Sequence, residues 1–421
     1  MRKTRKCITV RLFDSASVWL KVRLSSAITK HIQIYMESSA MNFNERARIE
    51  IDLDAIEYNY RTIKDRIPEG TKVCCVVKAD AYGHGAVRVA HLLSEIGVDF
   101  FAVSNLDEAL VLRKGGISDK ILILSYTPPN RAKELSEFGI SQCVYSKEYA
   151  DALAAKAYEE GIKIAAHIKI DTGMGRLGFV FRHSPDESLE QIVAACSHSC
   201  FELEGIFTHF PCADEDVCGK TKDQFDRFIE VVDKLEGCGF HFKIRHCANS
   251  ATSLRFPEYS LDMVRLGIAL YGALPSENMQ VEFIPRPTFT LKTVISNIKT
   301  VKAGDTIGYG ASYSATKDTR IATIPIGYAD GILRECATNG AELLINGVPC
   351  KIVGRICMDQ MMLDVDGAGD LRVGDEVTVF GGKDGISLLE MARYCKTIPY
   401  EMLCMPAARI PRIYLKNGIA Q

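Results

Sequence analysis

The sequence of 421 residues has little of what marks secreted, membrane-bound or nucleic-acid-binding proteins. Its formal net charge is only -2, which gives no reason to expect nucleic acid or an anionic membrane as a partner. No apolar run reaches the length of a signal-peptide core or of a membrane span. We therefore expect a cytoplasmic protein without a nucleic-acid or membrane partner.

The 15 cysteines lack the spacing of a disulfide framework or of a metal site. They are dispersed along the chain, no C-x-x-C pair occurs, and Cys74, Cys75 and Cys143 fall in apolar segments. The histidines also lack the ligand spacing of a structural zinc site, so we expect no metal. Reduced thiols in the core are the interpretation that fits a cytoplasmic chain.

The first 45 residues differ in composition from the rest. Residues 1–43 carry eight Lys and Arg against Asp14 and Glu37, and they include Trp19, the only tryptophan. We predict a basic leader outside the folded domains, either poorly ordered or translated from upstream of a start at Met36 or Met41. A transit-like or nucleic-acid-binding leader is the less favoured alternative.

Eight apolar, β-branched segments alternate with amphipathic helical patterns after the leader. A G-x-G-x-x-G turn is missing after the first of them, so a dinucleotide-binding sheet has little support. Eight strand–helix pairs over roughly 200 residues favour a (β/α)8 TIM barrel, which we assign to residues 46–284. The predicted strands are residues 72–78, 99–103, 120–125, 142–145, 162–170, 202–208, 242–246 and 261–266.

After residue 284 the pattern changes to proline-spaced β segments with one good short helix, SLLEMARYC. This pattern predicts a second, mainly antiparallel β domain over residues 285–421. The strand at residues 46–53, which falls at the segment ARIEIDLD, can join that domain.

Lys78 ends the first barrel strand, in KVCCVVK. A lysine at the end of a buried strand is costly unless it is solvated, paired or used chemically. The C-terminal strand ends form the active-site face of such a barrel, so Lys78 is a candidate Schiff-base amine. Taken alone, it is equally compatible with a lysine that reaches out to solvent.

Other polar residues follow later strands, and phosphate sites in this fold often lie after strands seven and eight. Ser250 and the turn at Gly267 and Ile268 fall in those two loops. A strand-end lysine together with a phosphate site suggests pyridoxal 5'-phosphate as the cofactor.

The segment VVKADAYGHG resembles the cofactor-lysine motif of alanine racemases. The resemblance continues in order through HIKIDTGMGRLGF, FTHFPCADE, CANSAT, VRLGIALYG, GDTIGYGASY, IPIGYADG, VGRICMDQMMLDV and TIPYEML, and ends at RIPRIY. It covers about residues 46–415, and the ordered set is far more specific than any single motif.

The resemblance implies an alanine racemase that interconverts L-alanine and D-alanine and supplies D-alanine for peptidoglycan. Family members move the Cα proton of a pyridoxal-phosphate aldimine with two acid–base groups, one on each face. Lys78 and Tyr309 match these two catalytic residues, although Tyr309 taken alone fits better as a packing residue of the β domain. In the family's head-to-tail homodimer, Tyr309 and Met358 come from the second subunit, with the Met358 amide near the substrate carboxylate.

The resemblance also assigns roles to charged residues in the barrel. Arg265 would face the pyridine nitrogen, and His209 would bridge Arg265 to Tyr309. A salt bridge between Arg265 and Asp262 is the alternative from the sequence alone.

Lys169 matches a lysine that carries a CO2-derived carbamate in the family, and Arg176 matches the arginine that binds the substrate carboxylate. A plain ion pair between Lys169 and Asp171 is the alternative. The remaining residues that match cofactor ligands are Tyr82, Asn249, Ser250, Gly267, Ile268 and Tyr400.

Rival functions are open from the sequence. A serine or broad-specificity racemase of the same fold is the first alternative, and a non-catalytic pyridoxal-phosphate-binding protein is a distant one. A basic amino-acid decarboxylase does not contain the GYGASY and CMDQ segments, and a cofactor-free Schiff-base aldolase leaves the phosphate loops unexplained.

Overall fold

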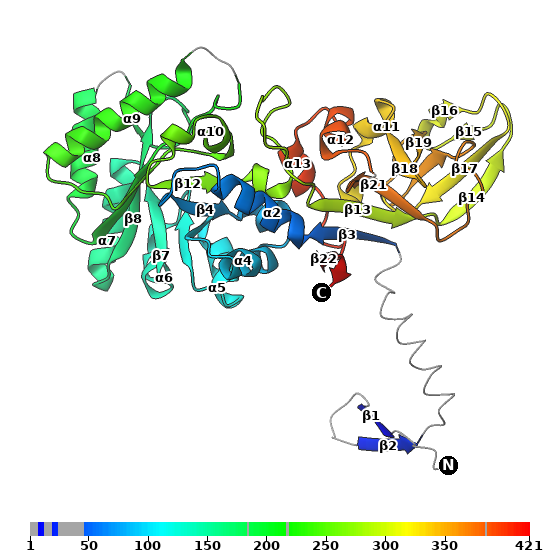
Figure 1. Cartoon of the computed structure of the whole chain (residues 1–421), viewed down its shortest axis with the longest axis horizontal. Helices are drawn as coiled ribbons and strands as arrows, with labels where there is room; N and C mark the ends of the chain where they lie inside the picture. The colour runs from blue at the N-terminus through cyan, green and yellow to red at the C-terminus, as the bar shows by residue number, and fades with distance from the viewer. Residues whose placement is uncertain (1–6, 12–18, 24–45, 183–184, 216–218, 384) are drawn as a thin grey trace.

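The structure, a computed structural model, describes residues 7–11, 19–23, 46–182, 185–215, 219–383 and 385–421. From residue 46 on, the chain forms two domains that lie next to each other, a parallel barrel and a mainly antiparallel β domain (Figure 1). The architecture predicted from the sequence is confirmed. Among the described residues, no helix has the length and apolar character needed to cross a membrane.

The barrel contains all eight predicted strands, with ends that differ from the prediction by up to two residues. Their order in the sheet is β11-β10-β8-β7-β6-β5-β4-β12. Backbone hydrogen bonds from Arg265 N to Ala248 O (2.9 Å) and from Asp262 N to Arg245 O (3.1 Å) join the last strand to its neighbour and close the barrel. The strands are β4 (Lys72–Val76), β5 (Phe100–Val103), β6 (Lys120–Ile123), β7 (Ile140–Val144), β8 (Ile164–Asp171), β10 (Phe201–Phe207), β11 (Ile244–His246) and β12 (Met263–Leu266).

Helices cover the outside of the barrel, and local sequence sets where several of them begin and end. Ser146 caps the longest of the middle helices by accepting a hydrogen bond from Tyr149 N, and Gly161 ends it with φ 64°. Asn105 and Asp52 cap two other helices in the same way. The helices of this domain are α2 (Leu53–Lys64), α3 (Lys78–Tyr82), α4 (Ala86–Glu95), α5 (Leu106–Lys114), α6 (Ala132–Glu137), α7 (Lys147–Glu160), α8 (Pro185–Cys196), α9 (Lys220–Gly237) and α10 (Ser250–Arg255).

The second domain is built on a sheet in the order β14-β17-β20-β19-β18-β21-β13-β3-β22-β23. Its pairs are antiparallel except for β3 (Ala47–Asp52) with β22 (Arg412–Lys416). The chain therefore begins this sheet with β3, runs through the whole barrel and returns at β13. The other strands are β13 (Phe289–Val294), β14 (Asn297–Val301), β17 (Thr319–Ile324), β18 (Glu342–Ile345), β19 (Val348–Val353), β20 (Met361–Asp364), β21 (Glu376–Gly381) and β23 (Ile419–Ala420).

Short helices and a small hairpin complete this domain. Helix α13 (Pro399–Cys404) lies on the side of the domain that faces the barrel, and the hairpin of β15 (Thr306–Ile307) and β16 (Tyr313–Ser314) lies at the opposite end (Figure 1). The remaining helices are α11 (Arg334–Thr338) and α12 (Leu388–Tyr394).

The expectation that the cysteines are all reduced is wrong at one pair. Cys336 in α11 and Cys395, directly after α12, form a disulfide. The two residues are 59 positions apart in the sequence, and the packing of α11 near α12 brings them together, so their spacing gave no signal. Cys74, Cys75 and Cys143 are free thiols buried in barrel strands, as expected.

Most of the predicted leader, residues 1–45, lies outside the described residues. Within it, β1 (Cys7–Arg11) and β2 (Trp19–Arg23) pair as antiparallel strands. The described part of the leader therefore contains a pair of antiparallel strands that the composition did not indicate.

Candidate active site

Lys78 lies at the start of a left-handed turn and not at the last position of a strand. Strand β4 ends at Val76, and every residue from Ala79 to Tyr82 has φ between 51° and 53°. This conformation costs roughly 1–2 kcal/mol for each residue with a side chain. Strain of this kind persists only where the surrounding structure fixes it, and it is concentrated at functional sites.

Hydrogen bonds to two carboxylates fix the turn from the barrel side. Glu108 accepts from Ala79 N (2.8 Å) and from Ser104 N (2.7 Å), so it ties the turn to the end of β5. Asp80 accepts from Ala86 N (2.7 Å) and thereby caps α4. The backbone direction after Lys78 is therefore set by its neighbours.

The β domain fixes the same turn from the other side. Gly83, with φ 78°, approaches α13 so closely that a Cβ there would lie 2.2 Å from Leu403 O. A Cβ on Gly85 would lie 1.8 Å from the Tyr414 hydroxyl, and Arg412 donates to Gly83 O (3.1 Å). The glycines of AYGHG are needed for this close contact between the domains.

The environment of Lys78 favours a neutral amine. Burial and the nearby positive charge of Arg176 lower its pKa, and Glu108 opposes the shift. Because a neutral amine is the nucleophile, this shift suits a lysine that forms an imine.

Tyr82, four residues after Lys78, reaches a small cradle of polar groups in the last two barrel loops. Gly267 N donates to Ser250 Oγ (2.9 Å). A Cβ on Gly267 would lie 2.9 Å from the Tyr82 hydroxyl and 4.0 Å from Ser250 Oγ, so it would fill the cradle. Two hydroxyls and a backbone N–H at the start of η3 (Ile268–Tyr271) are suitable donors for a phosphate.

Tyr400 and Asn249 support the cradle. The Tyr400 ring lies 6.1 Å from that of Tyr82, and burial raises the pKa of both phenols, so both are neutral donors. The Asn249 side chain caps α10 by accepting from Thr252 N (2.9 Å) and donates to Phe210 O (3.0 Å). Asn249 therefore orients Ser250 at the start of that helix.

Arg265 is buried, and its guanidinium is not paired with a carboxylate among the described residues. It donates to the ring nitrogens His246 Nδ1 (2.9 Å) and His209 Nδ1 (3.3 Å) and to Thr208 O (2.8 Å) and Cys247 O (3.1 Å). Burial lowers the pKa of Arg265 to about 10, which leaves it a cation at neutral pH.

The alternative of a salt bridge between Arg265 and Asp262 is wrong. Asp262 pairs with Arg245 (2.8 Å) at the other end of the strands. His209 contacts Arg265 as expected, and burial next to Arg265 and Lys169 lowers its pKa well below the usual range, so it accepts from Arg265 as a neutral ring.

Lys169 is buried with an Nζ that has no hydrogen-bond partner among the described residues. The Asp171 carboxylate instead accepts hydrogen bonds from Gly173 N (2.9 Å) and Gly175 N (2.8 Å) and forms an ion pair with Arg182 (2.8 Å). The alternative of a plain Lys169–Asp171 pair is therefore wrong. Burial and the charge of Arg265 lower the pKa of Lys169 well below its usual range.

Arg176 is exposed beside this group, and no hydrogen bond or ion pair holds its guanidinium in the described part of the chain. Its charge is close enough to lower the pKa of Lys78, Lys169 and His209. It is thus an unpaired cation close to Lys78, available to an anionic ligand.

Tyr309 is not brought to Lys78 within one chain, and both Tyr309 and Met358 are exposed. They are 70% and 54% exposed. Tyr309 begins η4 (Tyr309–Ala311) in the β15–β16 hairpin, at the end of the β domain far from the barrel (Figure 1). Backbone bonds from Tyr328 N to Cys357 O (3.0 Å) and from Ala329 N to Met358 O (2.9 Å) join the GYADG and CMDQ segments.

Sequence reasoning missed Glu108, which holds the turn of Lys78, and three polar residues in the barrel interior, His167, Glu204 and His246. A signal was available for His167, because it alternates with Lys169 and Asp171 along β8 and so points to the same face. Glu204 had no such signal, because the pairing of β10 with β8 shifts between Leu203 and Gly205.

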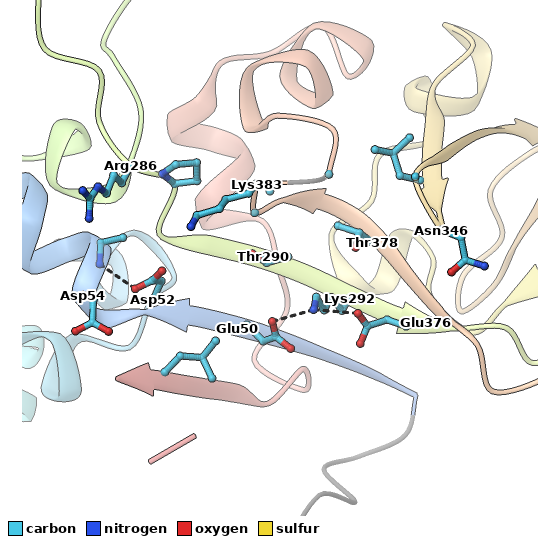
Figure 2. A pocket seen from close by; sticks show the side chains of 18 residues that line it. Glu50, Asp52, Asp54, Arg286, Thr290, Lys292, Asn346, Glu376, Thr378 and Lys383 are labelled. Carbon is cyan, nitrogen blue, oxygen red and sulfur yellow. Dashed lines mark hydrogen bonds and ion pairs between the residues drawn. The ribbon is translucent and has the colours of Figure 1, made fainter. Parts of the chain in front are cut away.

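A cavity of about 860 Å³ lies outside this site, on the sheet of the β domain. Figure 2 shows Lys292 between Glu50 and Glu376 on its floor, at 3.1 and 2.9 Å. Because these three charges are already paired, the cavity has fewer groups free to bind a ligand than the barrel site, where the cradle and the unpaired Lys169 lie.

Comparison with known proteins gives consistent matches over both domains. A family described as "Alanine racemase, N-terminal domain" matches residues 51–275, and "Alanine racemase, C-terminal domain" matches residues 288–414. The alanine racemase of Desulforamulus reducens is 41% identical over 368 residues, which are 87% of this chain and 98% of that protein.

Solved structures agree. The alanine racemase of Clostridium difficile 630 matches with a TM-score of 0.85 and 40% identity, over 90% of this chain and 98% of its own. The alanine racemase of Bacillus anthracis with bound L-Ala-P matches with a TM-score of 0.84 and 38% identity, over 90% of this chain and 97% of its own.

Proposed function

The chain belongs to the alanine racemase family, which depends on pyridoxal 5'-phosphate, and from this premise we propose that it interconverts L-alanine and D-alanine. The D-alanine would supply peptidoglycan synthesis, the usual role of the family. We place the reaction in the cytoplasm, as is general for alanine racemases.

One observation carries this proposal, namely the turn that presents Lys78. The same left-handed turn places Lys78 at its first residue and the Tyr82 hydroxyl in the cradle of Ser250 and Gly267. A ligand with a phosphate at one end and a carbonyl at the other would reach both. Pyridoxal phosphate has this form.

The residues present fit this cofactor. Lys78 would hold it through Nζ, and Tyr82, Ser250, Gly267, Ile268 and Tyr400 would hold the phosphate. When bound, the cofactor supplies the electron sink that makes the Cα proton of an amino acid removable. The protein has to hold it, orient it and move the proton.

Arg265 would face the ring nitrogen of the cofactor. Its cation is not neutralised by a carboxylate, and a fixed cation there disfavours protonation of that nitrogen. His209 would link Arg265 to the second acid–base group.

Two groups would exchange the proton, Lys78 Nζ on one face of the substrate and Tyr309 Oη on the other. Because Tyr309 and Met358 are exposed, and Tyr309 lies at the end of the β domain far from the barrel, we propose a head-to-tail homodimer with shared sites. Tyr309 of the partner subunit would complete each barrel site, and the partner's Met358 would offer its amide to the substrate carboxylate.

Lys169 would carry a carbamate. Its neutral Nζ can attack CO2, forming a C–N bond and releasing one proton, so that a buried unpaired amine becomes an anion. That anion would offset Arg265 and orient Arg176, which would then bind the substrate carboxylate.

The test is conversion of L-alanine to D-alanine by the purified protein supplied with pyridoxal phosphate, followed with a D-amino-acid-specific assay. L-serine and L-lysine are assayed in parallel. We expect alanine to have the highest kcat/KM. A higher kcat/KM for serine or lysine would reassign the substrate, and no turnover of any amino acid by the cofactor-loaded protein would contradict a racemase.

A further inference from the structure

A chain of buried hydrogen bonds runs through the barrel interior below Arg265. Arg265 contacts His246 Nδ1 (2.9 Å), and His246 Nε2 contacts His167 Nδ1 (2.9 Å). His167 Nε2 in turn contacts Glu204 Oε2 (3.2 Å). Both imidazoles are fully buried, and Glu204 is mostly so.

Arg265 and Glu204, at the two ends of this series of hydrogen bonds, determine which ring nitrogen carries each proton. Arginine can only donate, so His246 Nδ1 must accept and its Nε2 must carry the hydrogen. His246 then donates to His167 Nδ1, and His167 donates from Nε2 to the carboxylate. If both rings are neutral, each nitrogen and oxygen in this series of hydrogen bonds is either a donor or an acceptor, and every donor faces an acceptor.

Charge and burial agree with neutral rings. Burial lowers the pKa of His167, and burial together with Arg265 lowers that of His246 well below the usual range. Hydrogen bonds from His167, Lys120 and Ser141 lower the pKa of Glu204, so it is ionised at neutral pH. Lys169 is the other charged group near His246.

Local backbone features place Glu204 at the end of the chain. The register shift makes Glu204 the extra residue of a β-bulge, a feature that redirects a side chain. The next residue must be glycine, because a Cβ on Gly205 would lie 2.4 Å from His167 Nδ1. Phe207 stacks on the His246 ring at 4.7 Å between centroids, with planes 8° apart, and so fixes its orientation.

We propose that Glu204, His167 and His246 are positioning residues that lock His246 as a neutral Nε2–H tautomer, so that it offers a lone pair to Arg265. Without the carboxylate, the tautomers can reverse, and His246 would then turn an N–H toward the N–H of Arg265. These hydrogen bonds thus hold Arg265 in place while the Glu204 carboxylate stays two imidazole rings away from it. Their link to catalysis rests on the proposed function.

The test is ¹⁵N NMR of the histidine ring nitrogens in the cofactor-loaded and cofactor-free protein, from pH 5.5 to 8.5. Assignments come from His167→Gln and His246→Gln. The variants compared are Glu204→Gln, which keeps an acceptor, and Glu204→Leu, which does not. Asp151→Asn is the matched control, since Asp151 accepts from the partly exposed His198 at 2.9 Å.

We expect His167 and His246 to be neutral Nε2–H tautomers at every pH, in the unaltered protein, Glu204→Gln and Asp151→Asn. Glu204→Leu should show mixed tautomers. By analogy with partners that orient metal-bound histidines, kcat should fall about 10- to 100-fold in Glu204→Leu, with KM changed far less. Glu204→Gln should recover most of kcat.

An imidazolium, or an Nδ1–H tautomer at His246, in the unaltered protein would overturn the proposal even if every variant fails to fold. Native tautomers and native kcat in Glu204→Leu would also overturn it. The tautomers are measured without turnover, so this result is independent of whether the protein racemises alanine.

Discussion

Gly267→Ala tests whether the cradle holds the phosphate of the cofactor. The added Cβ would lie 2.9 Å from the Tyr82 hydroxyl, which is too close, so the hydroxyl has to move away. Gly267 also has φ -120° and ψ -108°, outside the main regions open to residues with a side chain.

The size of the effect follows from the hydrogen bonds at stake. A hydrogen bond to a charged group contributes about 1.5–3 kcal/mol. Loss of one such bond to the phosphate should weaken cofactor binding about 10- to 150-fold, at about 1.4 kcal/mol per factor of ten. The strained backbone should also lower the free energy of unfolding by about 1–3 kcal/mol.

The assay is titration of the cofactor-free protein with pyridoxal phosphate, followed by the visible absorbance of the bound cofactor. Gly237→Ala is the matched control, because a Cβ there meets no atom within 4 Å. If Gly267→Ala binds the cofactor as tightly as Gly237→Ala, the phosphate does not occupy this cradle.

Three further predictions concern the lysine, the second base and acid stability. Lys78→Ala should remove the absorbance of the bound cofactor and nearly all racemisation, and retention of both would place the attachment elsewhere. Tyr309→Phe should keep that absorbance and lower kcat at least about 10²-fold. Mixing the Tyr309→Phe and Lys78→Ala proteins under subunit exchange should restore activity. Heterodimers that are shown to form but have no activity would exclude a shared site. Burial lowers the pKa of His84 to about 4, so acidification from pH 6.5 to about 4 should cost up to about 1.4 kcal/mol of folding free energy per pH unit at this residue. In denaturant titrations His84→Gln should lose that part of the slope, and an unchanged slope would show that His84 does not contribute.

The sequence predicted the fold well, because apolar runs of strand length between amphipathic helices have few other arrangements. It did not predict the turn at Lys78, because ADAY has no glycine or asparagine to indicate positive φ. The alternation of side chains along a strand shows which of them point into the barrel, but it does not show which charged groups form ion pairs or hydrogen bonds there. For this reason Asp262 was a reasonable partner for Arg265, although it pairs with Arg245 instead.

Glu204 and Tyr309 show two further limits. The bulge at Glu204 breaks the period of two, so its inward position depends on pairing with a strand more than 30 residues away. Tyr309 could be assigned only by resemblance, because its distance from Lys78 depends on how two domains, and in our proposal two chains, are arranged.

The central claim is that Lys78 holds pyridoxal phosphate by its amine. The most direct measurement is borohydride reduction of the cofactor-loaded protein, which fixes the cofactor to whichever amine holds it, followed by peptide mass mapping. The account predicts one modified residue, Lys78, at nearly full occupancy. A label on Lys169 or on any other lysine, with Lys78 unmodified, would contradict it.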